Sequence, residues 1–212
     1  NFRLTGEELA FIIDDAGVHS LIVDPDLIPV VQSVRERLPC RRFYSVHGAL
    51  DGFACLESGL SVAAPVSEIA SSSAHDTLLI MYTSGTTGLP KGAMLTHGNI
   101  VWNNVNASLA FGANKSDVLL TAAPLFHIGG LNVMTISAFQ MGSPLVLLRH
   151  FDPEAVLDAI EEHSVTHMFG APAMFLFMAQ HPTFAARDLS SIEILIVGAA
   201  PCPESLISLY GQ

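Results

Sequence analysis

Short apolar runs alternate along this chain with longer segments that mix apolar and polar residues. Apolar runs bounded by Gly, Pro or Asp predict buried strands, and the longer mixed segments predict helices. We expect strands at residues 19–23, 42–46, 77–83, 92–96, 118–122, 144–148, 166–169 and 193–197. We expect helices at about 5–16, 98–110, 129–140, 152–163 and 173–180, and two more that begin near residues 24 and 203.

Several helix starts carry capping signals. Thr5 and Glu8 have the spacing of a capping box, in which each side chain accepts from the other residue's backbone N–H. Asp24 and Asp152 each precede a proline, which suits the first position of a helix. Residues 48–76 are rich in Gly, Ser, Ala and Pro, so we expect an irregular, exposed connection there and a possible subdomain seam. The alternation predicts an α/β fold with layered, largely parallel sheets flanked by helices.

The most informative stretch reads Tyr-Thr-Ser-Gly-Thr-Thr-Gly-Leu-Pro-Lys-Gly, at residues 82–92. It follows an apolar run, 78–82, that we expect to be a buried strand. Gly85 and Gly88 permit a tight turn whose successive amides can form a nest for an anion. Lys91 adds a point charge suited to phosphate. The stretch indicates a polyphosphate-binding loop, although a polar hairpin turn without a ligand explains the same composition.

The spacing of this stretch excludes a Walker A loop. That motif needs Gly-x-x-x-x-Gly-Lys-Ser/Thr and opens a helix. Here Pro90 precedes Lys91, Gly92 follows it, and residues 93–96 are short and apolar. We therefore expect a strand that returns from the loop, not a helix.

Composition narrows the possible partners. Half of the 212 residues are hydrophobic, 14% are charged, and the net charge is −11. Such an acidic chain is a poor match for nucleic acid or an anionic membrane, and it attracts ATP only locally, at Lys91. Cys40, Cys55 and Cys202 are widely spaced without a Cys-x-x-Cys pair, which indicates reduced thiols and a cytoplasmic protein.

One apolar region requires comparison with a membrane span. Residues 118–148 contain no Asp, Glu, Lys or Arg. The apolar run is interrupted before it reaches the length that a membrane helix needs. The breaks include Pro124, His127, Gly129 and Gly130. We expect strand, helix and strand there, and no membrane span.

The loop at 82–92 resembles the signature loop of the adenylate-forming superfamily, which includes acyl-CoA synthetases, peptide-synthetase adenylation domains and luciferases. The resemblance extends over most of the chain. The opening residues 1–9 resemble an upstream segment of that superfamily, and 124–127, Pro-Leu-Phe-His, resembles a segment of its acyl-CoA ligases. Residues 170–172, Gly-Ala-Pro, and 198–201, Gly-Ala-Ala-Pro, resemble two later pocket motifs.

The resemblance implies roles for individual residues. The phosphates of ATP would be bound by the loop residues Thr83, Ser84, Gly85, Thr86, Thr87, Gly88 and Lys91. Thr83 would also reach Mg²⁺, and adenine would contact Gly198, Ala199, Ala200 and Pro201. The acid would be bound by Phe126, His127, Gly170, Ala171, Pro172 and Met174, with Leu131 and Phe175 as further apolar walls. Lys91 and His127 would be the catalytic residues.

From the residues alone, plainer explanations stay open. A lone histidine after a strand is more often a hydrogen-bonded structural residue than a catalytic one. Gly-Ala-Pro and Gly-Ala-Ala-Pro are also ordinary turns between a strand and a helix. The resemblance favours function at His127, because the peptide-synthetase branch tends to carry a Phe-Asp pair in that region. His127 thus favours the acyl-CoA ligase branch.

The function implied is ATP-dependent activation of a carboxylic acid, with a fatty acid as the expected class, followed by thioester formation with CoA. The substrates would be the acid, ATP and CoA. The alternatives are a nucleotide-binding remnant without catalysis and an adenylation domain for an aryl or amino acid. The superfamily's Tyr-Gly-x-Thr-Glu motif, ribose-binding Asp and mobile small domain are absent from these 212 residues. We therefore expect a fragment of the large N-terminal domain, without the C-terminal domain, inactive alone and able to self-associate.

Overall fold

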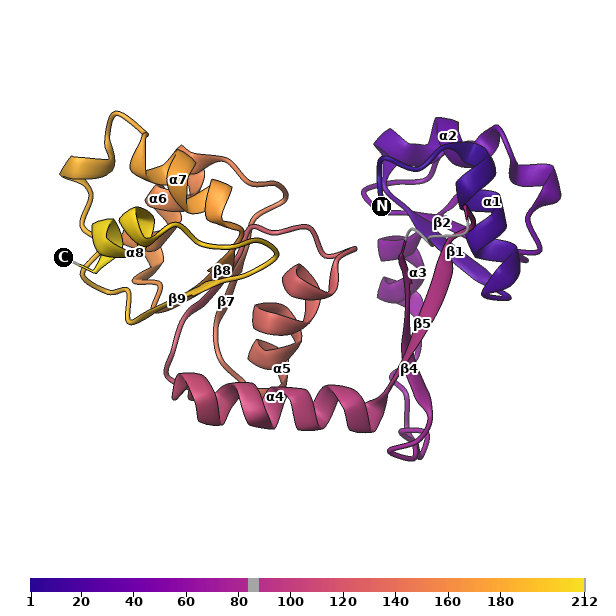
Figure 1. The fold of residues 1–212 in the computed structure, drawn as a ribbon. Helices are drawn as coiled ribbons and strands as arrows, with labels where there is room; N and C mark the ends of the chain where they lie inside the picture. The colour runs from indigo at the N-terminus through magenta and orange to yellow at the C-terminus, as the bar shows by residue number, and fades with distance from the viewer. Residues whose placement is uncertain (84–87, 212) are drawn as a thin grey trace. The chain divides into compact units, whose positions relative to one another are not determined.

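The computed structural model describes residues 1–83 and 88–211 (Figure 1). The chain divides into two compact units, Asn1–Thr96 and His97–Gln212. Residues 48–76 lie inside the first unit. Each unit has its own sheets and its own hydrophobic core.

The first unit contains a three-stranded parallel sheet in the order β1-β2-β3. Its strands are β1 (Ser20–Val23), β2 (Arg42–Ser45) and β3 (Ala54–Cys55). The helical elements are α1 (Gly6–Asp15), η1 (Pro25–Leu27), α2 (Ile28–Gln32), η2 (Arg35–Arg37) and α3 (Leu56–Val62). Apolar residues of α1, α2 and the sheet form its core, including Ile13, Val23 and Val31. Burying this apolar surface is what stabilises so small a sheet.

The predicted caps of this unit are confirmed. Thr5 Oγ1 accepts from the Glu8 N–H at 3.3 Å, and Glu8 Oε2 accepts from the Thr5 N–H at 2.8 Å. Asp24 Oδ1 accepts from the Asp26 N–H at 3.1 Å, at the start of η1. The helix expected from residue 24 is therefore a 3₁₀ turn followed by the short helix α2.

The expectation of an irregular connection over 48–76 is wrong in part. Cys55 ends β3 and begins α3, and its sulfur accepts from the Ser58 N–H at 3.4 Å. The polar composition hides these elements because α3 buries no residue completely. The exposed character is confirmed, since Val62 and Ile69 are 83% and 96% exposed.

The loop stretch lies on an antiparallel hairpin formed by β4 (Thr77–Thr83) and β5 (Lys91–Thr96). Both strands were expected, but β4 is not buried. Leu78 and Ile80 are each 41% exposed. The hairpin pairs with no other described strand, so among the described residues it is a two-stranded sheet of its own.

The second unit contains a four-stranded parallel sheet in the order β7-β6-β8-β9. Its strands are β6 (Leu119–Thr121), β7 (Leu145–Leu147), β8 (His167–Gly170) and β9 (Ile194–Val197). The helical elements are α4 (His97–Phe111), η3 (Gly129–Ile136), α5 (Ser137–Met141), α6 (Pro153–His163), α7 (Pro172–Ala179), η4 (Phe184–Ala186) and α8 (Glu204–Tyr210). The three- and four-stranded sheets are parallel and have helices packed on them, and only the β4–β5 hairpin is antiparallel among the described strands, so the predicted, largely parallel α/β fold is confirmed.

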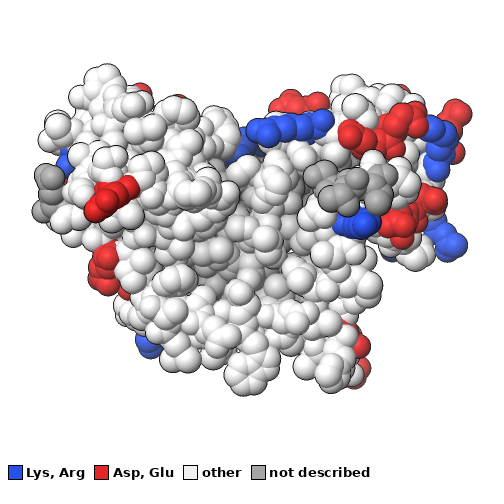
Figure 2. All heavy atoms as spheres, in the orientation of Figure 1, with Lys and Arg blue, Asp and Glu red and all other residues white. Residues whose placement is uncertain are grey.

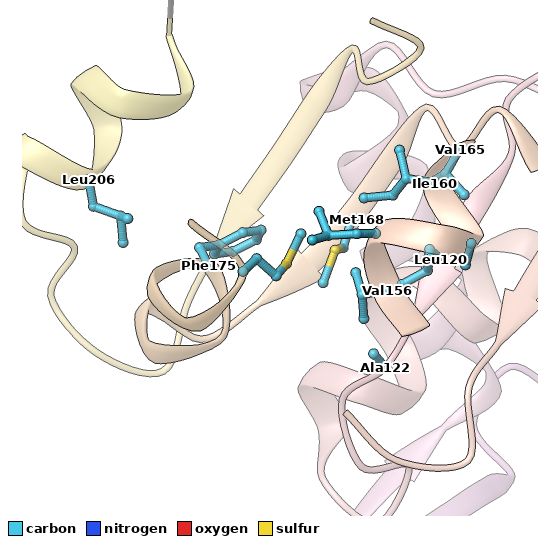
Figure 3. Close-up of a cluster of buried hydrophobic side chains, with 11 residues drawn as sticks. Leu120, Ala122, Val156, Ile160, Val165, Met168, Phe175 and Leu206 are labelled. Atoms are coloured by element: carbon cyan, nitrogen blue, oxygen red, sulfur yellow. The ribbon is translucent and has the colours of Figure 1, made fainter. Parts of the chain in front are cut away.

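Alternate residues of the central strands face two different cores. Leu120 and Met168 are fully buried against α6, α7 and α8, in the cluster that Figure 3 shows. Leu119, one residue away, packs instead with Met134 of η3 and Ala138 of α5. Side chains of a strand alternate between its faces, so β6 and β8 bury residues on both faces, including the polar Thr121 and His167.

The expected helix at 129–140 has a different geometry. Residues 129–136 form a π-helix, and only α5 after it is an α-helix. Hydroxyl bonds accompany the wider turn: Thr135 Oγ1 donates to the Gly130 carbonyl at 3.0 Å, and Ser137 Oγ donates to the Asn132 carbonyl at 3.1 Å. π-helical turns are rare and are found frequently at functional sites.

Across the described ranges, no helix is both long and apolar enough to cross a membrane. Residues 118–148, the charge-free region, are divided among β6, η3, α5 and β7. The strand-helix-strand order expected there is confirmed.

Candidate functional site

The predicted phosphate loop is closed at its base by Thr83 and Lys91. These two residues face each other as the last pair of the β4–β5 hairpin, and both are exposed. Gly88 has a φ of +94°, a left-handed conformation that glycine adopts without strain. Ser84, Gly85, Thr86 and Thr87, the central residues of the predicted loop, lie outside the described residues. The described part therefore supplies a hydroxyl and a cation side by side at the loop's base.

Three other predicted segments follow three neighbouring strands of the second unit. The Pro-Leu-Phe-His segment follows β6, the Gly-Ala-Pro segment follows β8, and the Gly-Ala-Ala-Pro segment follows β9. Because β6, β8 and β9 are parallel neighbours, their carboxyl ends share one edge of the sheet. The chain also changes direction at β6, which has β7 on one side and β8 on the other. Such switch points are where open α/β sheets bind ligands.

The segment after β6 turns sharply into the π-helix. The His127 N–H donates to the Pro124 carbonyl at 3.2 Å, and the His127 carbonyl accepts from the Leu131 N–H at 3.0 Å. The imidazole is exposed and lies 4.7 Å from the Phe126 ring, centroid to centroid. His127 thus has a backbone fixed at both sides and a side chain open to solvent.

Gly130 is essential to this turn. A Cβ at Gly130 would lie 2.3 Å from the Pro124 carbonyl oxygen and 2.7 Å from that of Ala123. Both atoms belong to the backbone, which cannot move aside as a side chain can. Without a side chain, Gly130 lets the first turn of the π-helix pack against the backbone of Ala123 and Pro124. This close packing keeps His127 at the sheet edge.

The segments after β8 and β9 are hydrogen-bonded to each other. The Gly198 N–H donates to the Gly170 carbonyl at 3.1 Å, which continues the strand pairing by one bond. Ala199 has a φ of +70°, a conformation that L-residues other than Asn and Asp rarely adopt. It is exposed, as are Ala200 and Pro201, so a flat ligand could reach this backbone.

Of the predicted pocket walls, Phe175 is a core residue and Met174 is half-buried against the core. Phe175 is 1% exposed and belongs to the main core, so it cannot line an open pocket. Met174 packs against that core, and its sulfur accepts from the Ala171 N–H at 3.4 Å. Phe126 and Leu131 are half-buried and remain available as walls.

Phe169 is a site residue that the sequence gives no reason to choose. A Cβ at Gly129 would lie 2.8 Å from Phe169 Cε1, and one at Gly198 would lie 2.8 Å from Cε2. The ring therefore fills the space between the segment after β6 and the segment after β9. It forms an apolar floor at this edge of the sheet.

Two polar side-chain atoms of the second unit are buried without a hydrogen-bond partner among the described residues. Asn132 Oδ1 and His167 Nε2 are buried, and no described residue hydrogen-bonds to either. The other nitrogen of His167, Nδ1, is 2.8 Å from Thr166 Oγ1. Buried polar groups are nearly always hydrogen-bonded, so both atoms are candidate contacts for water or a ligand. Neither could be found from sequence, since each depends on tertiary burial.

Charge is distributed unevenly between the two units. The second unit has three Lys or Arg side chains, Lys115, Arg149 and Arg187, and none lies in the three segments at the sheet edge. Arg187 is held by Asp158 and Glu161, with contacts of 2.6 and 2.7 Å. On the face drawn in Figure 2, most blue side chains lie over the first unit. The three segments after β6, β8 and β9 therefore carry no Lys or Arg, and the predicted phosphate loop of the first unit carries Lys91.

The parallel sheet with three segments at its carboxyl edge, in one unit, and the hydroxyl- and lysine-bearing hairpin, in the other, are features of α/β proteins that bind nucleotides. The chain belongs to the family of AMP-binding enzymes, whose sequence profile matches residues 1–211.

The similar proteins are acid–CoA ligases. A feruloyl-CoA synthase of Amycolatopsis sp is 38% identical over 214 residues, which cover 99% of this chain and 40% of that protein. The long-chain-fatty-acid–CoA ligase FadD13 of Mycobacterium tuberculosis is 32% identical over 210 residues, 99% of this chain and 41% of that protein. The inhibitor-bound N-terminal domain of FACL13 from Mycobacterium tuberculosis has a TM-score of 0.85 at 31% identity, covering 100% of this chain and 52% of that one. The chain thus spans about 40% of the length of these curated relatives.

Proposed function

We propose that the protein to which this chain belongs is an AMP-forming acid–CoA ligase. The observation that carries the proposal is the hairpin loop, whose base sets Thr83 opposite Lys91 and whose sequence resembles the signature loop of the adenylate-forming superfamily. The names of the relatives support the same reaction class. In this reaction a carboxylate oxygen attacks the α-phosphate of ATP and pyrophosphate leaves, giving an acyl-adenylate. The sulfur of CoA then attacks the acyl carbon, and AMP leaves.

The loop would bind the β- and γ-phosphates of ATP. Lys91 contributes a charge-assisted contact, and Thr83 contributes a hydroxyl on the neighbouring strand. Phosphoryl transfer needs mainly positioning and neutralisation of charge, which these groups supply. Magnesium usually retains several waters and shares its other positions with the phosphates, so a single protein oxygen such as that of Thr83 fits this demand. The ion would neutralise the charge that pyrophosphate carries away.

The sheet edge would bind the rest of the substrates. The backbone at the half-buried Gly198 and the exposed Ala199 and Ala200 suits a flat base. His127, open to solvent beside Phe126, would hydrogen-bond the carboxylate of the acid and orient it for attack. Its role is to position that carboxylate and the adenylate that forms from it.

The acid would carry a large, uncharged, apolar acyl group. Phe126, Leu131 and the Phe169 floor are apolar, and no Lys, Arg, Asp or Glu lies in the edge segments. An amino acid would need a carboxylate partner for its ammonium group, which these segments do not contain. Aryl and fatty acids both satisfy these conditions, and the named relatives include one of each. A fatty acid was the expectation from sequence; the apolar edge supports aryl acids equally.

The compartment is also a proposal. Cys40, Cys55 and Cys202 are all free thiols. Free thiols are typical of proteins kept in a reducing compartment, which supports a cytoplasmic location.

The test is acid-dependent exchange of pyrophosphate into ATP by the full-length protein, with and without Lys91→Ala. Loss of a charge-assisted contact costs about 1.5–3 kcal/mol, so the exchange rate should fall about 10- to 150-fold. Lys115→Ala, which removes an exposed lysine of the second unit, is the matched control and should keep the wild-type rate. An unchanged rate in Lys91→Ala would refute the assignment of the loop. A panel of aryl and fatty acids in the same assay identifies the substrate class.

A further inference from the structure

A side-chain hydrogen bond connects the loop-bearing hairpin to helix α1. The Tyr82 hydroxyl donates to Asp15 Oδ2 at 2.5 Å. Asp15 is the last residue of α1, and Tyr82 is the residue immediately before Thr83 at the base of the loop. The contact therefore acts one residue away from the first predicted phosphate ligand.

Gly92 provides the space that this contact needs. Gly92 is the cross-strand partner of Tyr82. A Cβ at Gly92 would lie 3.0 Å from Tyr82 Cζ and 2.8 Å from Ile80 Cγ2. The tyrosine ring thus lies across the glycine backbone, and any side chain at Gly92 would push the ring, and its hydroxyl, away from Asp15.

The contact between Tyr82 and Asp15 lies on one face of the hairpin, and the side chains at the base of the loop, Thr83 and Lys91, lie on the opposite face. Successive side chains of a strand point to opposite faces, so Tyr82 and Thr83 lie on different faces of β4. Lys91 pairs with Thr83 and shares its face. Asp15 can consequently hold Tyr82 without obstructing either Thr83 or Lys91.

We infer that Asp15 and Tyr82, with Gly92 beneath the ring, form a positioning pair that fixes the direction in which the loop presents Thr83 and Lys91 to the triphosphate of ATP. The inference rests on the proposed function, in which this loop binds the triphosphate. Neither residue of the pair touches the nucleotide. Their effect on it passes through the backbone of the hairpin.

The ionisation state of the pair agrees with this role. Burial raises the pKa of Tyr82 to about 12, and the hydrogen bond and negative charge of Asp15 act in the same direction. The phenol therefore remains a proton donor over the whole range in which enzymes of this kind work.

The experiment compares Tyr82→Phe, Asp15→Ala and the double variant in the full-length protein. Each single variant should raise the KM for ATP about fivefold, the value of one ordinary hydrogen bond, with little change in the KM for the acid. The double variant should be no worse than either single variant, because both remove the same contact. Asp15→Asn, which keeps an acceptor, should restore most of the affinity.

The controls are Tyr44→Phe and Asp14→Ala, which make the same chemical changes on β2 and on the neighbouring position of α1. Hydrogen exchange of the β5 amides, Lys91–Thr96, gives a readout that needs no nucleotide, and it should be faster in Tyr82→Phe than in Tyr44→Phe. Unchanged exchange together with an unchanged KM for ATP in both single variants would overturn the inference. A wild-type protein without acid-dependent ATP–pyrophosphate exchange would overturn the proposed function instead, and the amide exchange would still decide whether the pair holds the hairpin.

Discussion

Gly130 lies where one added methyl group would collide with the main chain. The three atoms nearest to a Cβ there are the Pro124 oxygen at 2.3 Å, the Ala123 oxygen at 2.7 Å and the Pro124 carbonyl carbon at 2.8 Å. All three belong to the backbone of the segment that leads to His127. Gly130→Ala must therefore displace either that segment or the first turn of the π-helix.

The expected cost follows from this geometry. Overpacked sites lose about 1–3 kcal/mol, and the upper end applies here because no flexible side chain can absorb the clash. Relief requires a shift of about 1 Å, and a displacement of that size near reacting groups can reduce the rate about 100-fold. We therefore expect Gly130→Ala to lose about 3 kcal/mol of unfolding free energy and most of its adenylation activity.

Urea denaturation and ATP–pyrophosphate exchange, both on the full-length protein, measure these two effects. Gly59→Ala is the matched control, because Gly59 lies in α3 with no atom within 4 Å of the added Cβ. Alanine in a helix interior is favoured over glycine by about 0.5–1 kcal/mol, so this control should be neutral or more stable. If Gly130→Ala keeps wild-type stability and rate, the reasoning about a rigid turn is refuted.

Other substitutions probe the sheet edge and its supports. His127→Ala should lower kcat with the acid while ATP affinity, measured separately by titration, changes little; full activity would make His127 a structural residue. Ala199→Gly should raise the unfolding free energy by about 0.5–1 kcal/mol, because glycine removes the strain of the positive φ, and a loss of stability would contradict that explanation. Tyr210 donates to the Phe175 carbonyl at 2.7 Å, and burial raises the pKa of Tyr210 from 10.0 to about 12. The folded state then keeps a proton that the unfolded state loses, so stability should fall as the pH rises from about 10 to about 12. Tyr210→Phe should remove part of that slope in urea titrations at several pH values, and an unchanged slope would contradict the assignment.

The sequence predicts the strands well because their environment is simple. Leu120 and Met168 are buried on one face and Leu119 on the other, so β6 and β8 lie in mainly apolar stretches without exposed polar residues in alternation. Thr5 and Asp152 signal helix starts through local bonds alone. Features that depend only on near neighbours in the chain are therefore within reach of sequence.

The sequence did not predict features that depend on distant parts of the chain, nor a short helix with an unusual cap. The spacing of residues 129–140 fits an α-helix and a π-helix equally well. The structure has a π-helix there, and its first turn passes close to the backbone of Pro124. The helix α3 escaped notice because its cap is Cys55, which is not a usual capping residue. Phe175 was expected in a pocket because it follows the Gly-Ala-Pro segment, but its turn of α7 faces the core.

The candidate site residues show the same division. The strand-end segments could be placed at one edge from their order after parallel strands, and the structure has them there. The strand order β7-β6-β8-β9, which makes β6 the switch point, depends on how the helices pack and is not encoded in any single segment. The contact between Tyr82 and Asp15 joins residues 67 positions apart and carries no local signal.

The Phe169 ring has a consequence for how this family can vary. Its two edges occupy the space that side chains at Gly129 and Gly198 would need. The side chains at these three positions therefore compete for the same space. A relative with a small residue in place of Phe169 has room for a side chain at the position of Gly129 or Gly198. A relative with the large ring does not. The volumes of the side chains at these three positions should covary among AMP-binding enzymes. Moving a large side chain from one of the three positions to another offers a way to reshape the floor of the proposed acid site at constant total volume.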